Sequence, residues 1–258
     1  MRHRTPAALV PLLLFFPVLL GAQPAPSEGD PYADYATLLS RYVRDGEVDY
    51  ARWKVDAPPA WDRFLDWLEA ADPSAWPRAD QRAFWINAYN ARVIEGILDR
   101  YPIDSVRDVG LVGGRLRGFF GRREHPVAGR ERTLEEIEKE ILLEQPLRSA
   151  AIHWGLTCGS RGCPVLRSEP YRGPALERQL DFQAGTYVNS PAGHRLDPER
   201  STIYLTRIFD WWREDFEREA GSVREYAERY LTGAALEALR AGWKIDYLDY
   251  DWSLNETS

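Results

Sequence analysis

The chain has 258 residues, of which 28% are charged, and a formal net charge of −7 at pH 7. An acidic protein is repelled by the phosphate backbone, and its arginines are scattered rather than clustered, so the composition argues against a nucleic-acid partner. Ten tryptophans and thirteen tyrosines supply enough apolar surface for a substantial core.

Residues 1–22 have the pattern of a secretory signal peptide. A basic start at Arg2 and Arg4 precedes an apolar stretch, and Gly21-Ala22 offers a small-residue cleavage site. The apolar stretch is too short to favour a membrane span, and no later segment is apolar for long enough to form one. We therefore expect a periplasmic or secreted protein with no transmembrane span after signal removal.

After a short disordered tether at residues 23–31, three helices are expected in the N-terminal half. Apolar residues recur at helical spacing in each of them. The predicted helices cover residues 32–44, with an Asp45-Gly46 stop, residues 61–68, and a third that begins at an Asp80 cap and ends at Arg100 before Tyr101-Pro102.

The middle of the chain is broken up by glycines, three of which are Gly110, Gly113 and Gly114. A strand and turn are predicted at residues 125–130. Thr133 and Glu136 then fit a capping box, with Thr133 as the N-cap of a helix through Leu143. The apolar run at residues 150–157 predicts a central strand that leads into a cysteine-containing loop.

The C-terminal part predicts helices, two strands in a hairpin and a final strand. These elements are a helix at 174–188, a hairpin-like pair around 195–196 and 201–205, helices at 208–218, 223–230 and 234–241, and a strand at 243–248. The predicted fold class is α+β: a helical N-terminal half packed on a small, mostly antiparallel sheet with further helices. Residues 32–258 are expected to form a single domain.

The third predicted helix carries two amides within an apolar stripe. Asn87 and Asn90 share a face with Ile94 and Ile97 by their spacing. A buried amide without partners costs about 1–3 kcal/mol per unmet group. Two readings remain open: the amides bind the backbone of a neighbouring loop, or one of them orients a catalytic side chain or polarises a substrate amide.

Both cysteines of the chain lie in the segment from His153 to Pro164. In an oxidising compartment an even number of cysteines suggests a disulfide, and the flanking glycines would let Cys158 and Cys163 approach each other. Closing so short a loop would stabilise the fold by only about 2 kcal/mol. A structural disulfide is therefore one reading of this loop.

The other reading is a nucleophilic thiolate at Cys158, which needs a nearby base. His153 lies five residues earlier, and an odd separation on a regular strand points the two side chains to opposite faces, so the strand must end or bulge before a dyad can form. In that case Ser160 is an expected oxyanion donor, and Asn87 or Asn90 would orient the imidazole.

No metal and no cofactor are predicted. The five-residue intervals among His153, Cys158 and Cys163 lack the close CxxC spacing of zinc sites. Arg161 and Arg167 flank the loop, where they either clamp a substrate carboxylate or form ion pairs.

Several segments together resemble the family called domain of unknown function 547 (DUF547). They are Phe84–Ala91, Tyr101–Ile103, Leu134–Glu138, His153–Leu166 and Tyr247–Asn255. The resemblance implies a family core at about residues 78–190, followed by C-terminal helices and a last strand within 200–255. It adds weight to His153, Cys158, Ser160, Cys163 and Pro164, which match the cysteine motif. Proteins of this kind often have a histidine directly after the Ile-Glu pair, where this chain has Lys139.

Two functions follow from these residues. The first is a thiol-dependent hydrolase or transferase that uses Cys158 with His153 on an unidentified small molecule or peptide. The second is a non-catalytic binding or scaffold domain in which a Cys158–Cys163 disulfide shapes a recognition loop. Reversible redox work by the cysteine pair is a weaker third reading.

Overall fold

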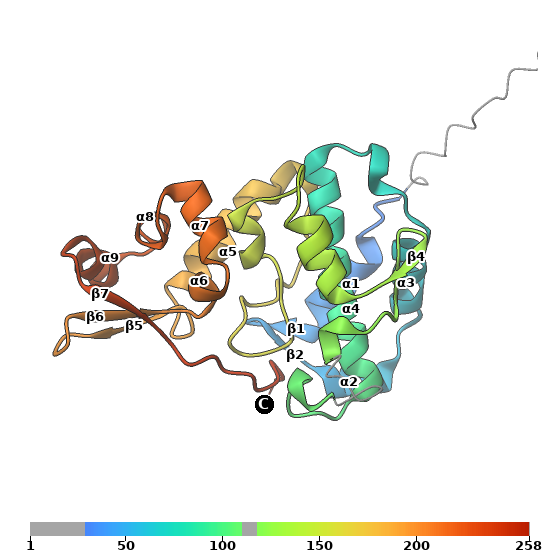
Figure 1. The fold of residues 1–258 in the computed structure, drawn as a ribbon. Helices are drawn as coiled ribbons and strands as arrows, with labels where there is room; N and C mark the ends of the chain where they lie inside the picture. The colour runs from blue at the N-terminus through green and yellow to red at the C-terminus, as the bar shows by residue number, and fades with distance from the viewer. Residues whose placement is uncertain (1–28, 110–117, 258) are drawn as a thin grey trace, which may run out of the picture. The chain divides into compact units, whose positions relative to one another are not determined.

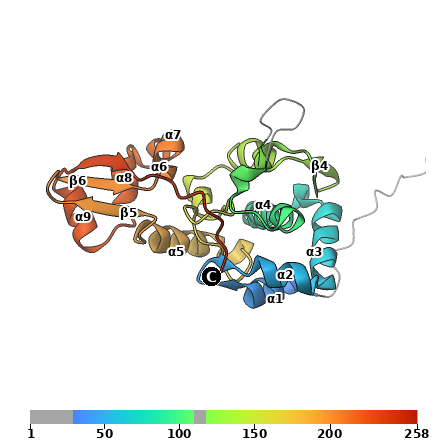
Figure 2. The same ribbon diagram turned by 90° about the horizontal axis from the view of Figure 1, so that it is seen from below.

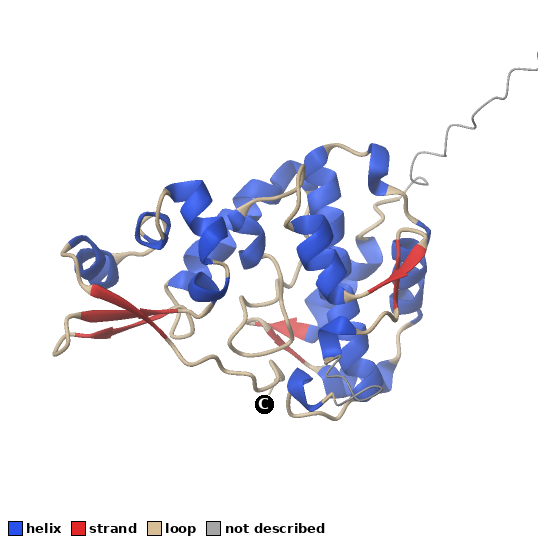
Figure 3. Ribbon diagram, in the orientation of Figure 1, coloured by secondary structure: helices blue, strands red, loops and turns tan. Residues whose placement is uncertain are grey.

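The computed structural model describes residues 29–109 and 118–257. The predicted signal peptide, most of the tether, and Gly110, Gly113 and Gly114 lie outside the described residues. The chain divides into two compact units, residues 1–30 and 31–258. All helices and strands given below belong to the second unit (Figure 1). Helices and short separate strands together form an α+β fold, as the sequence predicted (Figure 3).

The N-terminal half is helical, as expected. Its elements are α1 (Ala33–Tyr42), β1 (Val43–Arg44), β2 (Glu47–Val48), α2 (Tyr50–Asp56), α3 (Pro59–Ala70), a 3₁₀ turn η1 (Pro73–Ala75) and α4 (Arg78–Arg100). The sequence did not predict α2, a short helix whose first turn is capped by the Asp49 side chain accepting the Arg52 N–H. The predicted Asp80 cap is wrong, because α4 begins at Arg78 directly after Pro77.

Helix α4 is the central element of this unit. From Ala83 to Leu98 all its residues except Glu95 are buried. An apolar stripe of one face would leave the other faces in water, so burial on every side means that other segments surround this helix. In Figure 2 it is seen nearly end on, with α1, α2 and α3 on one side. Helix α4 therefore provides a rigid support for the loops that cross it.

The middle of the chain contains one hairpin and several single turns of helix. These are η2 (Val106–Asp108), η3 (Phe119–Gly121), the antiparallel strands β3 (His125–Val127) and β4 (Arg130–Arg132), the π-helix η4 (Glu136–Leu142) and the 3₁₀ helix η5 (Ala150–Trp154). Thr133 caps the helix as predicted, since its Oγ1 accepts the Glu136 N–H at 2.9 Å. The helix then widens to π geometry instead of continuing as an α-helix.

The central strand predicted at residues 150–157 is wrong. The first five of these residues form η5, where the Ser149 hydroxyl accepts the Ala151 N–H at the start of the turn. Every residue from Ala150 to Thr157 is buried. An apolar run that is buried on all sides has no period, so its sequence cannot distinguish a strand from a helix.

The C-terminal part contains the largest sheet. Its elements are η6 (Gly173–Ala175), α5 (Leu176–Val188), β5 (His194–Asp197), β6 (Thr202–Leu205), α6 (Ile208–Trp211), α7 (Arg213–Ala220), α8 (Val223–Ala227), α9 (Gly233–Arg240) and β7 (Lys244–Tyr247). Strand β6 is central, antiparallel to β5 and parallel to β7. The predicted helix at 208–218 is divided at Trp212 into α6 and α7.

Residues 248–257 form a tail that returns from β7 to the N-terminal half. In Figure 1 this tail runs from β7 to a C-terminus close to β1 and β2. Isolated bridges pair Val48 with Glu256 and Ser160 with Leu254. The tail therefore joins the first hairpin to the cysteine loop, two segments more than 100 residues apart in the sequence. Within the described residues no helix is long and apolar enough to cross a bilayer.

Candidate functional site

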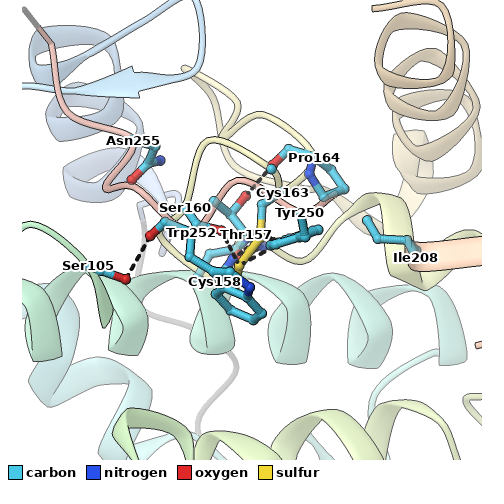
Figure 4. Close-up of a disulfide and its surroundings, with 12 residues drawn as sticks. Ser105, Thr157, Cys158, Ser160, Cys163, Pro164, Ile208, Tyr250, Trp252 and Asn255 are labelled. Carbon is cyan, nitrogen blue, oxygen red and sulfur yellow. Dashed lines mark hydrogen bonds between the residues drawn. A yellow bond between two sulfur atoms is a disulfide. The ribbon is translucent and has the colours of Figure 1, made fainter. Parts of the chain in front are cut away.

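The cysteine loop, residues 157–164, is closed by a disulfide. Cys158 and Cys163 are bonded, with their Cα atoms 6.1 Å apart (Figure 4). The base of the loop is held by the Thr157 hydroxyl, which donates to the Pro164 carbonyl at 3.1 Å. Gly159 has a φ of +82°, and a Cβ there would lie 2.6 Å from the Ile97 Cδ1 atom. The left-handed backbone conformation favours glycine at this turn, and a larger residue would also have to displace the Ile97 side chain.

Hydroxyl groups surround the two sulfur atoms. The Tyr250 hydroxyl lies 3.0 Å from the Cys163 sulfur and 3.3 Å from that of Cys158, and the Ser160 hydroxyl lies 3.0 Å from the Cys158 sulfur. The backbone N–H of Cys158 also donates to the Cys163 sulfur at 2.9 Å. Burial raises the pKa of Tyr250 well above its usual value, so its hydroxyl keeps its proton and remains a donor.

The two amides of α4 position the loops on either side of the disulfide. The Asn90 Nδ2 donates to the Gly155 carbonyl at 2.9 Å, and its Oδ1 accepts the Thr157 N–H at 2.8 Å. Asn87 does the same for Tyr171, donating to its carbonyl and accepting its N–H at 2.8 and 2.9 Å. Both amides are buried and bind the backbone of neighbouring loops, which agrees with the first of the two hypotheses for this pair.

The disulfide forms part of the wall of a cavity of about 220 Å³, called here the aromatic pocket. Its lining includes six aromatic rings from four parts of the chain. The lining residues are Tyr89, Phe120, Glu135, Glu138, Lys139, His153, Leu156, Cys158, Cys163, Pro164, Ile208, Trp211, Trp212, Tyr250 and Trp252. An apolar cavity with a few converging polar groups is the usual form of a small-molecule site.

Glu138 is the acidic group of the aromatic pocket whose ionisation is most altered. Burial raises its pKa to about 7, although the positive charge of Lys139 acts in the opposite direction. The Lys139 ammonium lies 3.3 Å from Glu135, four residues earlier. Glu138 belongs to the π-helix η4, and π-helical turns are frequent at functional sites. Glu138 is therefore a carboxyl that changes charge near neutral pH.

His153 reaches the same pocket with one of its ring nitrogens held. Its Nε2 lies 2.9 Å from the Asp215 Oδ2, and its ring stacks on Trp212 with the centroids 4.7 Å apart. Burial lowers the pKa of His153 against the opposing effect of Asp215, so the neutral imidazole donates its Nε2–H. This arrangement leaves Nδ1 as the nitrogen with a lone pair.

Asp215 carries the negative charge that holds the imidazole. Burial raises its pKa, but hydrogen bonds from His153, Arg148 and Arg218 outweigh burial and hold the pKa well below its usual range. A buried carboxylate that receives several donors is a rigid acceptor. Among the described residues no hydrogen bond joins the side chains of His153 and Cys158, so the two approach each other only as walls of one pocket.

The two arginines that flank the loop face elsewhere. Arg161 forms an ion pair with Glu47 and donates to the Glu256 carbonyl at 2.7 Å. Arg167 forms an ion pair with Glu169. Neither lines the aromatic pocket. Their role in binding a substrate stays a prediction, as do the catalytic roles of Asn87, Asn90 and Ser160.

Sequence reasoning did not select Glu138, Asp215, Tyr250 or Trp252. Glu138 and the two tail aromatics lie in segments that carried the family resemblance. Asp215 is one of several acids in an aromatic stretch, and only the fold places it against His153. In the described ranges no group of three or more His, Cys, Asp or Glu side chains is arranged to hold a metal ion.

Comparison with known proteins gives one positive result. Neither a curated protein nor a solved structure is similar enough to this chain to count as a match. Residues 73–188 match the model of the family described as "Protein of unknown function, DUF547". These residues include α4, the π-helix, the cysteine loop and α5, so the match covers most of the pocket wall. This match confirms the resemblance to DUF547 that was seen in the sequence, and it extends over residues 73–188.

Proposed function

We propose that this protein is a thiol-dependent hydrolase or transferase that acts on a small molecule or peptide bound in the aromatic pocket. The observation that carries this proposal is the placement of the Cys158–Cys163 disulfide and the Asp215-held His153 in the wall of one cavity. The disulfide is then the resting, oxidised form, and a thiol reductant converts it to the dithiol that reacts.

The proposed reaction uses Cys158, because this residue is partly exposed whereas Cys163 is buried. In the dithiol form the His153 Nδ1 takes the Cys158 proton, and Asp215 stabilises the imidazolium that results. The thiolate attacks a carbonyl carbon to form a thioester, and the leaving group departs with the proton from His153. Water or a second acceptor then releases the acyl group. Hydrogen bonds from Ser160 and Tyr250 favour the thiolate.

The competing function is a binding or scaffold domain with a structural disulfide. It is supported by the tail, which holds the loop through the Arg161 N–H to the Ser253 carbonyl and the Asn255 N–H to the Gly159 carbonyl, at 2.9 and 3.1 Å. A loop fixed in this way needs no chemistry to be useful. The two functions differ in whether the disulfide opens under mild reduction.

Export to the periplasm or the cell exterior is also proposed, on the basis of the signal pattern at residues 1–22. A disulfide is more common in proteins of oxidising compartments. Fractionation of expressing cells, with the mass of the mature N-terminus, tests this. A mass that retains residues 1–22 in the cytoplasmic fraction would contradict it.

The first experiment is alkylation followed by intact mass, before and after treatment with glutathione. We expect no labelling of the oxidised protein, then faster labelling of Cys158 than of free cysteine at pH 7 after reduction. His153→Gln should slow this labelling several-fold, whereas His194→Gln is the matched control, because His194 does not line the pocket. If Cys158 labels no faster than free cysteine, the thiol mechanism is rejected and the scaffold function is retained.

A second readout uses Cys158→Ser. If the loop acts by chemistry, this variant loses acyl-transfer activity on thioester or ester probes while its melting temperature approaches that of the reduced wild type. If the loop is architectural, Cys158→Ser changes only stability.

A further inference from the structure

We propose that the aromatic pocket binds a small organic ammonium ion, with the cationic nitrogen between the Glu138 carboxylate and the three-ring wall formed by Trp211, Tyr250 and Trp252. This inference deepens the proposed function by naming the substrate class, and it rests on that function only for the step from ligand to substrate. The binding itself requires no thiol chemistry.

The rings of the three-ring wall pack against one another at tilted angles, and the Trp252 ring already has a cation over it, the Arg107 guanidinium at 5.3 Å from its centroid. The ring centroids of Trp211 and Tyr250 are 4.7 Å apart, those of Tyr250 and Trp252 are 4.7 Å apart, and those of Trp211 and Trp252 are 5.9 Å apart. Aromatic faces carry partial negative charge and attract quaternary ammonium groups. Trp211 lines the pocket and is 47% exposed, so part of its large apolar ring contacts solvent.

The charge of the pocket favours a cation over an anion. Two of its lining residues are acids and one is a base. The base, Lys139, is paired with Glu135 at 3.3 Å. Glu138 is thus the lining acid whose carboxylate forms no hydrogen bond or ion pair within the described residues. A partly buried carboxylate without a partner carries some desolvation cost, and a bound cation would reduce that cost.

The size of the pocket limits the ligand. A volume of about 220 Å³ is smaller than the 300–1,000 Å³ typical of drug-sized ligands. Tetramethylammonium and choline are therefore suitable probes, and 3,3-dimethylbutan-1-ol is the neutral molecule with the same shape as choline. A comparison of choline with this alcohol isolates the contribution of the positive charge.

Binding of the cation should depend on pH through Glu138. The other titratable groups that line the aromatic pocket are Glu135, Lys139, Tyr89, Tyr250 and His153. Burial raises the pKa of both tyrosines and lowers that of the histidine, so all three are uncharged at neutral pH. Glu135 and Lys139 are paired with each other. This leaves Glu138 as the lining group that gains charge near pH 7.

The test is isothermal titration of the oxidised protein with choline and with 3,3-dimethylbutan-1-ol at pH 6 and pH 8. We expect choline to bind at least about tenfold more tightly than the alcohol at pH 8. Its affinity should rise about tenfold from pH 6 to pH 8, as the ionised fraction of a carboxyl with a pKa near 7 does. The affinity of the alcohol should not change. Equal affinities for the two molecules, or no binding of choline, would overturn the proposal.

Variants locate the site. Glu138→Gln should remove the pH dependence and reduce the affinity for choline about tenfold at pH 8. Trp211→Ala should reduce the affinity for choline at both pH values. Glu140→Gln is the matched control, because Glu140 is exposed on the same helix and does not line the pocket. Because the titration uses the disulfide form, choline binding without thiol reactivity would support this inference and reject the mechanism. Thiol reactivity without choline binding would support the thiol mechanism and reject this inference.

Discussion

Asn87 and Asn90 of α4 are buried, as is His153 in the aromatic pocket, while Glu138 of the pocket is partly buried, and the fold gives these polar groups different partners. Asn87 and Asn90 each satisfy both ends of the amide with loop backbone. Glu138 has a carboxyl with no such partner among the described residues, and His153 has only its Nε2 held. Satisfied polar groups define the architecture, whereas unsatisfied ones beside a cavity indicate where a ligand acts.

The largest effect is expected where a satisfied amide is removed. Asn90→Ala should lower the free energy of unfolding by about 2–4 kcal/mol, because it leaves the buried Gly155 carbonyl and Thr157 N–H without partners. Urea denaturation of the purified protein measures this. Glu140→Gln serves as the control, because Glu140 is exposed and does not line the pocket, and it should change stability by less than about 0.5 kcal/mol. If Asn90→Ala lowers the free energy of unfolding by less than about 1 kcal/mol, the satisfied amides of α4 do not differ in this respect from the unpaired groups of the pocket.

Substitution of Glu138 is expected to raise the free energy of unfolding rather than lower it. Burial raises the pKa of Glu138 in the folded protein to about 7, above the usual 4.5 of a glutamate, so its contribution to stability is fully present below pH 4.5 and is lost as the pH rises through 7. Glu138→Gln should therefore stabilise the fold by about 1–3 kcal/mol at pH 8 and leave it nearly unchanged at pH 5. Urea denaturation at both pH values gives the answer. Equal stabilities at pH 8 would mean that this carboxyl is solvated.

Reduction of the disulfide tests how much the loop depends on it. The short interval between Cys158 and Cys163 predicts a loss of about 2 kcal/mol from chain entropy. The tail and Asn90 hold the same loop by hydrogen bonds. We therefore expect the reduced protein to remain folded, with a melting temperature lower by several degrees, as measured by circular dichroism with and without reductant. Unfolding on reduction would show that the bond cannot serve as a reversible reactive group.

The smallest effect is expected at the cap of the helix that carries Glu138. Thr133→Ala removes the acceptor of the Glu136 N–H and should cost about 1 kcal/mol. Thr133→Ser keeps the hydroxyl and should restore most of this loss. If Thr133→Ala changes the affinity for choline while Thr133→Ser is as stable as the wild type, the cap also positions the pocket. If neither variant differs from wild type, the cap has no measurable role.

Local patterns in the sequence predicted much of the fold. The stop at Tyr101-Pro102 ends α4, and the Thr133 hydroxyl caps its helix. The alternation before Leu205 marks β6. These features depend on neighbouring residues, so they can be read without knowing the rest of the chain. The run at 150–157 was misassigned for the complementary reason, since complete burial removes the period on which such a reading depends.

The candidate site could be predicted only in part. His153, Cys158 and Cys163 were selected because chemistry-bearing residue types gather in one short segment, and all three line the pocket. Asp215, Tyr250 and Trp252 come from α7 and the tail, 50 or more residues away. No local pattern connects them to the cysteine loop.

The sequence by itself determined the resemblance to DUF547, the fold class, the long helix α4 and the segment in which the two cysteines lie, because these follow from short-range periodicity and a contiguous motif. The tertiary structure decided which groups share the pocket, which amides are satisfied and which carboxyl is left without a partner. The physical reason is that burial, pKa and hydrogen bonding depend on what the rest of the fold places around a group. The tail reaches the cysteine loop, and α7 reaches His153, only after the chain has folded back.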